Sequence, residues 1–212
     1  DPPTPILLPV FLLPRDGTIT AVTDSTPLIA EFENSHPERS VYPSDPSLKF
    51  INYILEDFGD EWCTKFMFHY RWYFSEDADN AGTILPVGIM NNISDEELAF
   101  FKGHFTKRQV ERLWVVGSND ETASFIDKSY KSVLKILEIH VYIEPFLLGS
   151  TPSSCDFAVY GQLTQLIGFD PTPRRIAHEI APRVIGWVSS LEDRSGLEDK
   201  ENNLKLSDLP QT

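Results

Sequence analysis

The sequence has few cysteines and no long apolar run, and each shortage excludes a class of protein. Its two cysteines, Cys63 and Cys155, lie far apart, which excludes a disulfide framework and favours a reducing compartment. The most apolar stretch, residues 6–14, is broken by prolines and is far shorter than the ~20 residues of a membrane-spanning helix. We therefore expect no membrane span and a location in the cytoplasm or in an organelle.

Positive charge is also scarce. Eighteen Lys and Arg stand against 32 Asp and Glu, so the formal net charge is −14. Nucleic-acid binding requires a basic surface, and this composition excludes it. The first residues carry no basic segment of the kind that opens a signal peptide. The five histidines form no ligand motif with the cysteines, so we expect no metal site.

What the chain does contain is enough apolar material for a core. Its 212 residues are 41% hydrophobic and 12% aromatic, which fits one or two compact domains. Residues 6–13 and 18–23 read as strands on either side of a turn at residues 14–17, and predict a β-hairpin. The turn-like residues 24–27 then predict a short helix over about 26–34.

The remainder of the chain has helical patterning. Apolar residues three or four apart at positions 51, 54, 55, 58, 62, 66, 70 and 73 predict one long amphipathic helix over 46–74. Residues 76–93 contain Gly, Pro and Asn and predict a loop. Further helices are expected over about 94–116, 119–141, 153–167 and 182–193, followed by a polar tail. A capping box at 94–97 opens the first of them. The second has an apolar stripe at positions 126, 130, 133, 134, 137 and 141.

Ser153 and Asp156 form a second capping box at the start of the helix over 153–167. A Ser-x-x-Asp step before an apolar run lets the two side chains satisfy the first backbone amides of the helix. The carboxylate also faces the positive end of the helix dipole. We interpret Ser153 and Asp156 as a folding device and assign them no catalytic role.

The surroundings of that step resemble a known family. The string FLLGSTPSSCDF at 146–157 is similar to the motif that opens the core helix of glutathione transferases, and the segment APRVIGWVSSLEDRSG, with Trp187, resembles their last core helix. The resemblance extends over about residues 5–195. It implies a mostly α protein: a partial thioredoxin-like α/β domain over 1–42, an all-α glutathione-transferase-type helical bundle over 43–195, and a polar tail over 196–212.

The resemblance also implies a glutathione site. In this family a cis-proline, matched here by Pro9, follows a residue whose backbone pairs with the cysteinyl part of glutathione, matched by Leu8. An Asp-Ser or Glu-Ser step, matched by Asp24 and Ser25, binds the γ-glutamyl group. A helix N-terminus with a free hydroxyl suits a carboxylate, and an acidic side chain suits an α-ammonium group. On the residues alone, however, the Asp-Ser-Thr-Pro segment is only an N-cap.

The catalytic residue is not identified. In glutathione transferases a Tyr, Ser or Cys that activates the thiol lies in a strand-helix-strand half that precedes the hairpin, so its counterpart is expected upstream of Asp1. Either the sequence is part of a longer protein or another chain completes the sheet. Two functions remain open: an enzyme that conjugates glutathione, its co-substrate, to a small hydrophobic electrophile, and a non-catalytic structural or interaction subunit of a homodimer or larger assembly.

Other residues with reactive side chains have either a chemical or a packing role. The segment His69–Trp72 is the densest candidate, with Tyr70 as a donor to a thiolate and Arg71 facing an anion, but Tyr70 falls on the apolar stripe and favours a core role. Cys63 is interpreted as a structural thiol. Cys155, at the start of a helix, is either a thiol of lowered pKa or a small packing residue, and we favour packing.

Overall fold

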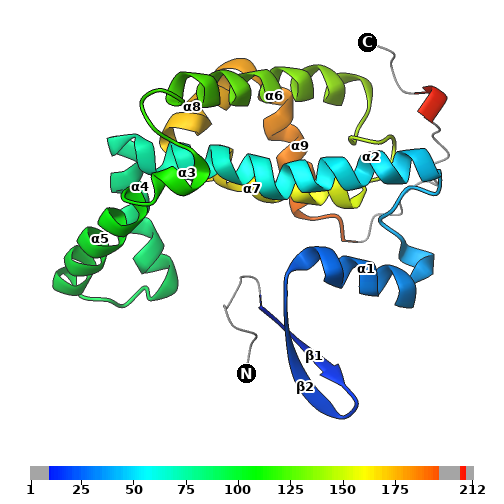
Figure 1. Cartoon of the computed structure of the whole chain (residues 1–212), viewed down its shortest axis with the longest axis horizontal. Helices are drawn as coiled ribbons and strands as arrows, with labels where there is room; N and C mark the ends of the chain where they lie inside the picture. Colours follow the sequence, from blue (N-terminus) through cyan, green and yellow to red (C-terminus); the bar gives the residue numbers. More distant parts are fainter. Residues whose placement is uncertain (1–9, 196–205, 209–212) are drawn as a thin grey trace. The chain divides into compact units, whose positions relative to one another are not determined.

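The computed structural model describes residues 10–195 and 206–208, so Leu8 and Pro9 lie outside the described residues. The chain is mostly helical and contains a small two-stranded antiparallel sheet (Figure 1). It divides into two compact units, residues 1–43 and residues 44–212. Each unit is described by itself below.

The first unit consists of a hairpin and a helix. Strands β1 (Val10–Arg15) and β2 (Thr18–Thr23) pair antiparallel, from Val10 opposite Thr23 to Arg15 opposite Thr18. The turn residues Asp16 and Gly17 both have positive φ, 49° and 75°, as a tight two-residue hairpin turn requires. Helix α1 (Ser25–Ser35) follows, then a short 3-10 turn, η1 (Pro37–Arg39). The predicted hairpin and helix are confirmed for the described residues.

The second unit opens with the long helix expected over 46–74. It consists of α2 (Pro46–Asp57), a π-helical turn η2 (Phe58–Cys63) and α3 (Thr64–Tyr73), with no break between them. The predicted buried face is wrong in part, because Ile54 and Trp62 are 48% and 56% exposed. The helix instead buries Asn52 and Glu56. A pattern that counts only apolar residues does not recognise a buried face that carries polar side chains.

The loop expected over 76–93 is wrong. Residues Ser75–Ile89 form helix α4, which continues through Pro86. Glycine favours loops, but the missing side chain of Gly82 is a packing feature here: a Cβ would lie 2.3 Å from Oγ1 of Thr106 on the next helix. That helix, α5 (Asp95–Val110), begins with the predicted Ser94/Glu97 capping box and ends earlier than expected, before a 3-10 turn η3 (Leu113–Val116).

The remaining helices build the bundle. They are α6 (Ala123–Ile143), α7 (Ser154–Gly168), α8 (Pro171–Ile180) and α9 (Pro182–Glu192), followed by the 3-10 turn η4 (Leu206–Asp208). Helix α8 was not predicted, because its two prolines resemble loop signals although both lie in the first helical turn, where proline is tolerated. Most of the expected polar tail, residues 196–205 and 209–212, lies outside the described residues.

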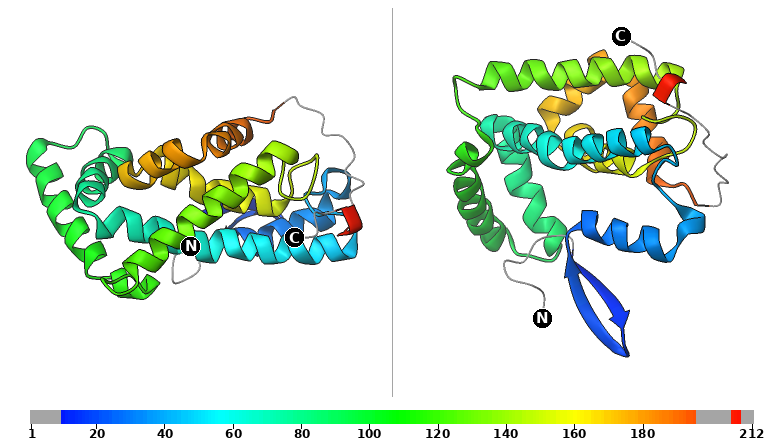
Figure 2. Two further views of the ribbon diagram at one scale, coloured as in Figure 1. Left: turned by 90° about the horizontal axis from the view of Figure 1, so that it is seen from above. Right: turned by 45° about the vertical axis from the view of Figure 1, so that its right-hand side comes forward.

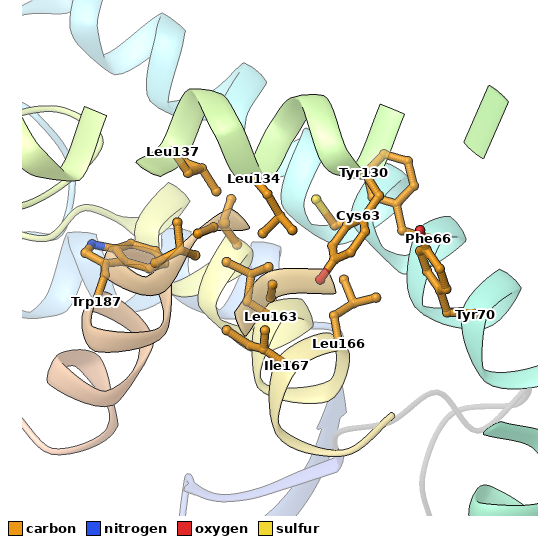
Figure 3. Packing of buried hydrophobic residues seen from close by; sticks show 14 of the residues in the cluster. Cys63, Phe66, Tyr70, Tyr130, Leu134, Leu137, Leu163, Leu166, Ile167 and Trp187 are labelled. Atoms are coloured by element: carbon orange, nitrogen blue, oxygen red, sulfur yellow. The ribbon is translucent and has the colours of Figure 1, made fainter. Parts of the chain in front are cut away.

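The main hydrophobic core surrounds α7, which lies beside the long helix and between the other bundle helices (Figures 1 and 2). Figure 3 shows Leu163, Leu166 and Ile167 of α7 facing Leu134 and Leu137 of α6, with Trp187 of α9 closing one side. The predicted α6 stripe is confirmed: positions 126, 130, 134 and 137 are buried, and positions 133 and 141 pack partly buried against the same cluster. Within the described residues no helix is both long and apolar enough to cross a membrane.

Candidate functional site

Asp24 lies where β2 ends and α1 begins, and its backbone is strained. It is the N-cap of α1, and its carboxylate accepts a hydrogen bond of 3.1 Å from the N–H of Thr26. Its φ is 75° and its ψ is 123°, a combination that residues with a Cβ rarely adopt. Such a conformation costs on the order of 1–3 kcal/mol and is concentrated at functional sites. Asp24 is exposed, so a ligand can reach its carboxylate.

Ser25 is the first residue of α1 and is half-buried. Across the described part of the chain, no hydrogen bond to its hydroxyl is found. The first amides of a helix have no partner inside the helix, and the N–H of Ser25 is one of them. Asp24 and Ser25 therefore bring together an acceptor for a cation and two donors for an anion on adjacent residues. This pattern matches an α-amino acid group, which carries both charges.

The two other residues assigned to glutathione, Leu8 and Pro9, are outside the described residues, and so is the peptide bond between them. The described strand β1 starts immediately after them and pairs with β2, the strand that leads into Asp24. The strand pairing thus brings Val10 opposite Thr23, one residue before Asp24.

Ser153 and Asp156 form the expected capping box at the start of α7. One carboxylate oxygen of Asp156 accepts from the N–H of Ser153 at 2.8 Å, and the other accepts from the N–H of Leu147 at 2.8 Å. Asp156 is fully buried, and Ser153 is 4% exposed. The carboxylate therefore ties the loop before α7 to the helix itself, which confirms that the motif is a structural cap.

Burial changes the protonation of this cap. It raises the pKa of Asp156 to about 6, although the two amide donors and the nearby His140 act in the opposite direction. The ionised form is the better acceptor for two N–H groups, but no cation among the described residues is hydrogen-bonded to it. Loss of water around the carboxylate is the larger effect.

Sequence reasoning missed the polar contacts that α2 makes with the same helix start. Asn52 donates to the hydroxyl of Ser154 at 2.7 Å and accepts from the N–H of Cys155 at 3.1 Å. The Ser154 hydroxyl in turn donates to the carboxylate of Glu56. Asn52 and Glu56 are spaced i, i+4 on α2, so one face of that helix carries both. That spacing was the available signal, but it is common on solvent-exposed helices too.

The segment His69–Trp72 belongs to the interior, where the four side chains are 0–7% exposed. Tyr70 donates to Asp127 at 2.8 Å, and His69 pairs through Nδ1 with the hydroxyl of Ser118 at 2.7 Å. Burial lowers the pKa of His69 to about 4, so its ring is neutral at pH 7. These contacts favour the packing role over a role beside a thiolate.

Arg71 faces an anion, as one interpretation of the sequence suggested, but the anion is an aspartate of the same chain. Its Nε lies 2.9 Å from Oδ1 of Asp170, its Nη2 lies 2.9 Å from Oδ2, and Nη2 also donates to Gln165. Asp170 is fully buried and Arg71 is 7% exposed. The pair joins α3 to the N-cap of α8. Arg71 is thereby committed to a structural contact.

Neither cysteine has the properties of a nucleophile. Cys63 is 2% exposed and Cys155 is fully buried. Burial raises the pKa of Cys63 to about 12 and raises the pKa of Cys155 as well. For Cys155, the neighbouring Asp156 adds to the effect of burial. The alternative of a lowered pKa for Cys155 is therefore wrong, because burial and that carboxylate outweigh its position at the start of a helix.

No group of His, Cys, Asp and Glu within residues 10–195 and 206–208 is arranged to hold a metal ion. No protein-family model matches the chain, and no curated protein matches it either. The interpretation of the site consequently depends on the chain's own residues and on the resemblance in sequence.

Proposed function

We propose that this chain is a glutathione-transferase-like protein, with a glutathione-transferase-type bundle over the second unit and a partial thioredoxin-like domain in the first. It binds glutathione and conjugates its thiol to a small hydrophobic electrophile. Asp24 and Ser25 hold the γ-glutamyl group, and Leu8 and Pro9 hold the cysteinyl backbone, while no residue is assigned to activate the thiol. The observation that supports this proposal best is the strained Asp24 at the start of α1, next to Ser25, whose hydroxyl has no hydrogen-bond partner among the described residues.

The chemistry of that pair suits its proposed ligand. The γ-glutamyl group ends in an α-carboxylate and an α-ammonium on one carbon. The Ser25 hydroxyl and N–H donate to the carboxylate, which also meets the positive end of the α1 dipole. The Asp24 carboxylate accepts from the ammonium. The strain at Asp24 is consistent with this role, because strained backbone conformations are concentrated at functional sites.

The experiment measures retention on immobilised glutathione, together with turnover of a generic aryl halide, on the chain with any natural sequence upstream of Asp1. Ser25→Ala removes one hydrogen bond to a charged group, worth about 1.5–3 kcal/mol, so affinity for glutathione falls about tenfold or more. Ser75→Ala is the matched control, because Ser75 is also the first residue of a helix, α4, and is exposed. Equal retention of both variants and the parent would contradict the γ-glutamyl assignment.

A second function is favoured by the hairpin itself. Leu12 and Ile19 are each 67% exposed, and the register places them on the same face, since Leu12 pairs with Ala21 and Ile19 with Pro14. A two-stranded hairpin is marginal by itself, and an apolar face of this kind is one that further strands or a partner chain cover. In this alternative the protein is a non-catalytic subunit of an assembly. Neither retention nor turnover in the experiment above, with a stable complex in size measurements, would favour it.

A further inference from the structure

Helices α4 and α5 line an apolar pocket that is open to solvent on one side. They run side by side as a hairpin (Figures 1 and 2), and the pocket has a volume of about 150 Å³. Its lining consists of side chains from the second half of α4, the linker and α5: Leu85, Pro86, Ile89, Met90, Ile93, Phe101 and Phe105. All of these side chains are apolar, so among the described residues nothing in the wall can pair with a charge.

The floor of the pocket is fixed to the core. Leu85 and Phe105 pack against the buried cluster of Trp72, Ala78 and Ala81. The ring of Phe105 lies edge-on to Trp72, with 5.6 Å between their centroids. The two helices also approach closely beside the pocket, because a Cβ at Gly82 would lie 2.3 Å from Oγ1 of Thr106. The wall that a ligand would meet at depth is therefore set by packing.

The rim is held by the backbone. The N–H of Met90 donates to the carbonyl of Pro86 at 3.0 Å, and the N–H of Ile93 donates to the carbonyl of Met90 at 3.4 Å. Ser94 and Glu97 then close the α5 capping box. These hydrogen bonds and the capping box define the course of the linker at the mouth of the pocket.

Apolar side chains at the rim face water. Ile89 is 90% exposed, Met90 is 44% exposed and Phe101 is 43% exposed. They surround a hollow into which an apolar molecule could move and remove their surface from water, at about 25 cal/mol per Å². The pocket is open to solvent on one side, and its volume is comparable to that of an apolar cavity that holds a benzene-sized molecule.

We propose that the α4–α5 pocket binds a neutral, apolar small molecule of single-ring size, such as an alkylbenzene or a halobenzene. The wall offers no partner to a charged group, and burying an unpaired charge is costly. The net charge of −14 further disfavours anions such as fatty acids. The inference does not depend on glutathione binding, since the pocket is formed by α4, the linker and α5 alone.

The test is a titration of the isotope-labelled full chain with toluene, followed by the backbone amide resonances of Leu85, Ile89, Met90 and Ile93. These resonances should shift in a saturable way with toluene, whereas benzoate and benzylamine at equal concentration should leave them unchanged. Ile89→Lys places a charge at the rim and should weaken toluene binding about tenfold. Ile139→Lys, at a 65% exposed position on α6, is the matched control and should leave binding unchanged. Because Ile89 is exposed, the substitution leaves the folded core intact.

Ile93→Trp is a second variant, which fills the pocket without adding charge and should abolish the saturable shift. The proposal is overturned by any of four results. The first two are the absence of a saturable toluene shift in the parent chain and an equal shift of the same resonances by benzoate. The other two are toluene binding by Ile89→Lys that equals that of the parent, and a shift of the resonances with protein concentration alone. The last result would show that a second copy covers the pocket.

Discussion

Asp77 of α4 accepts two hydrogen bonds from Thr172 in the first turn of α8, one from the backbone N–H at 2.8 Å and one from the hydroxyl. Asp77 is fully buried, and the two residues are 95 positions apart in the sequence. The carboxylate thus caps a helix to which it does not belong. It replaces the local cap that Asp170, engaged by Arg71, does not provide through its own side chain.

The same arrangement recurs at the start of the next helix and the preceding one. Glu138 of α6 accepts from the N–H groups of Arg183 and Val184 at the start of α9, at 2.8 Å and 3.3 Å. Asn52 of α2 accepts from the N–H of Cys155 in α7. Helices α7, α8 and α9 thus each receive a polar side chain from another helix at their N-terminal amides. The bundle is therefore joined by oriented hydrogen bonds as well as by apolar packing.

The first prediction concerns the Asp77 cap. Asp77→Ala leaves the N–H and the hydroxyl of Thr172 buried without an acceptor, which costs about 1–3 kcal/mol for each buried group left unsatisfied. We expect the midpoint of urea unfolding to fall accordingly. Asp79→Ala is the control: it removes an exposed carboxylate of the same helix, whose ion pair with Lys102 is worth less than about 1 kcal/mol. Equal effects of the two substitutions would refute a capping role for Asp77.

The second prediction concerns the crossing of the long helix and α7. A Cβ at Gly59, in the π-helical turn, would lie 2.8 Å from the backbone of both Ala158 and Val159. Backbone atoms cannot move aside as a side chain can, so Gly59→Ala should destabilise the protein by about 1–3 kcal/mol through overpacking.

Gly161→Ala is its matched control. Gly161 lies inside α7, where a Cβ would meet nothing within 4 Å, so the gain in helix propensity should stabilise the protein by up to about 1 kcal/mol. Opposite signs for the two glycines in chemical denaturation are the expected result. A stabilising Gly59→Ala would show that the two helices do not approach as closely as described.

The helices of the second unit differ in how well their sequences predict them. The α6 stripe was predictable, because its buried face is uniformly apolar and has the period of a helix. The buried face of α2 was not, since it carries Asn52 and Glu56, and only their partners on α7 explain why polar groups are inside. Helix α4 was hidden by Gly82 and Pro86, because local propensity cannot show that α5 approaches at Gly82.

Among the site and capping residues, some could be recognised from the sequence and others could not. Ser153 and Asp156 were assigned from a local motif, and local motifs can be recognised without tertiary structure. Asp24 and Ser25 were assigned by resemblance, and the positive φ of Asp24 could not be inferred from its residue type. The cross-helix caps Asp77 and Glu138 leave no local signal, because an acidic residue on a helix usually faces solvent.

The third prediction is a pH dependence from Asp156. Its folded-state pKa is raised by burial to about 6, above the ordinary value for an aspartate, so the folded protein binds a proton more tightly than the unfolded chain. The stability that this proton contributes is fully present below pH ~4 and is lost as the pH rises through about 6, by an amount on the order of 3 kcal/mol.

The measurement compares the parent with Asp156→Asn in urea unfolding at several values of pH between 4 and 7. The variant does not titrate, so the difference in unfolding free energy between the two proteins should shrink as the pH rises and become constant above about pH 7. A difference that grows with pH over this range would mean that the amide donors of Leu147 and Ser153 outweigh burial and that the pKa is lowered.

The last prediction separates strain from capping at Asp24. Asp24→Gly removes the Cβ that conflicts with a φ of 75°, and glycine at an N-cap costs only a few tenths of a kcal/mol. The substitution should therefore stabilise α1 by roughly 1 kcal/mol, seen as slower hydrogen exchange of its amides, while retention on immobilised glutathione falls. Asp45→Gly is the comparison, because Asp45 caps α2 with an ordinary φ of −71° and glycine should bring no relief there. A gain in stability accompanied by a loss of binding would mean that the strain is retained because it positions the carboxylate. If Asp24→Gly instead destabilised α1, the conformation would owe its persistence to the cap alone, and the principal support for a γ-glutamyl site would be gone.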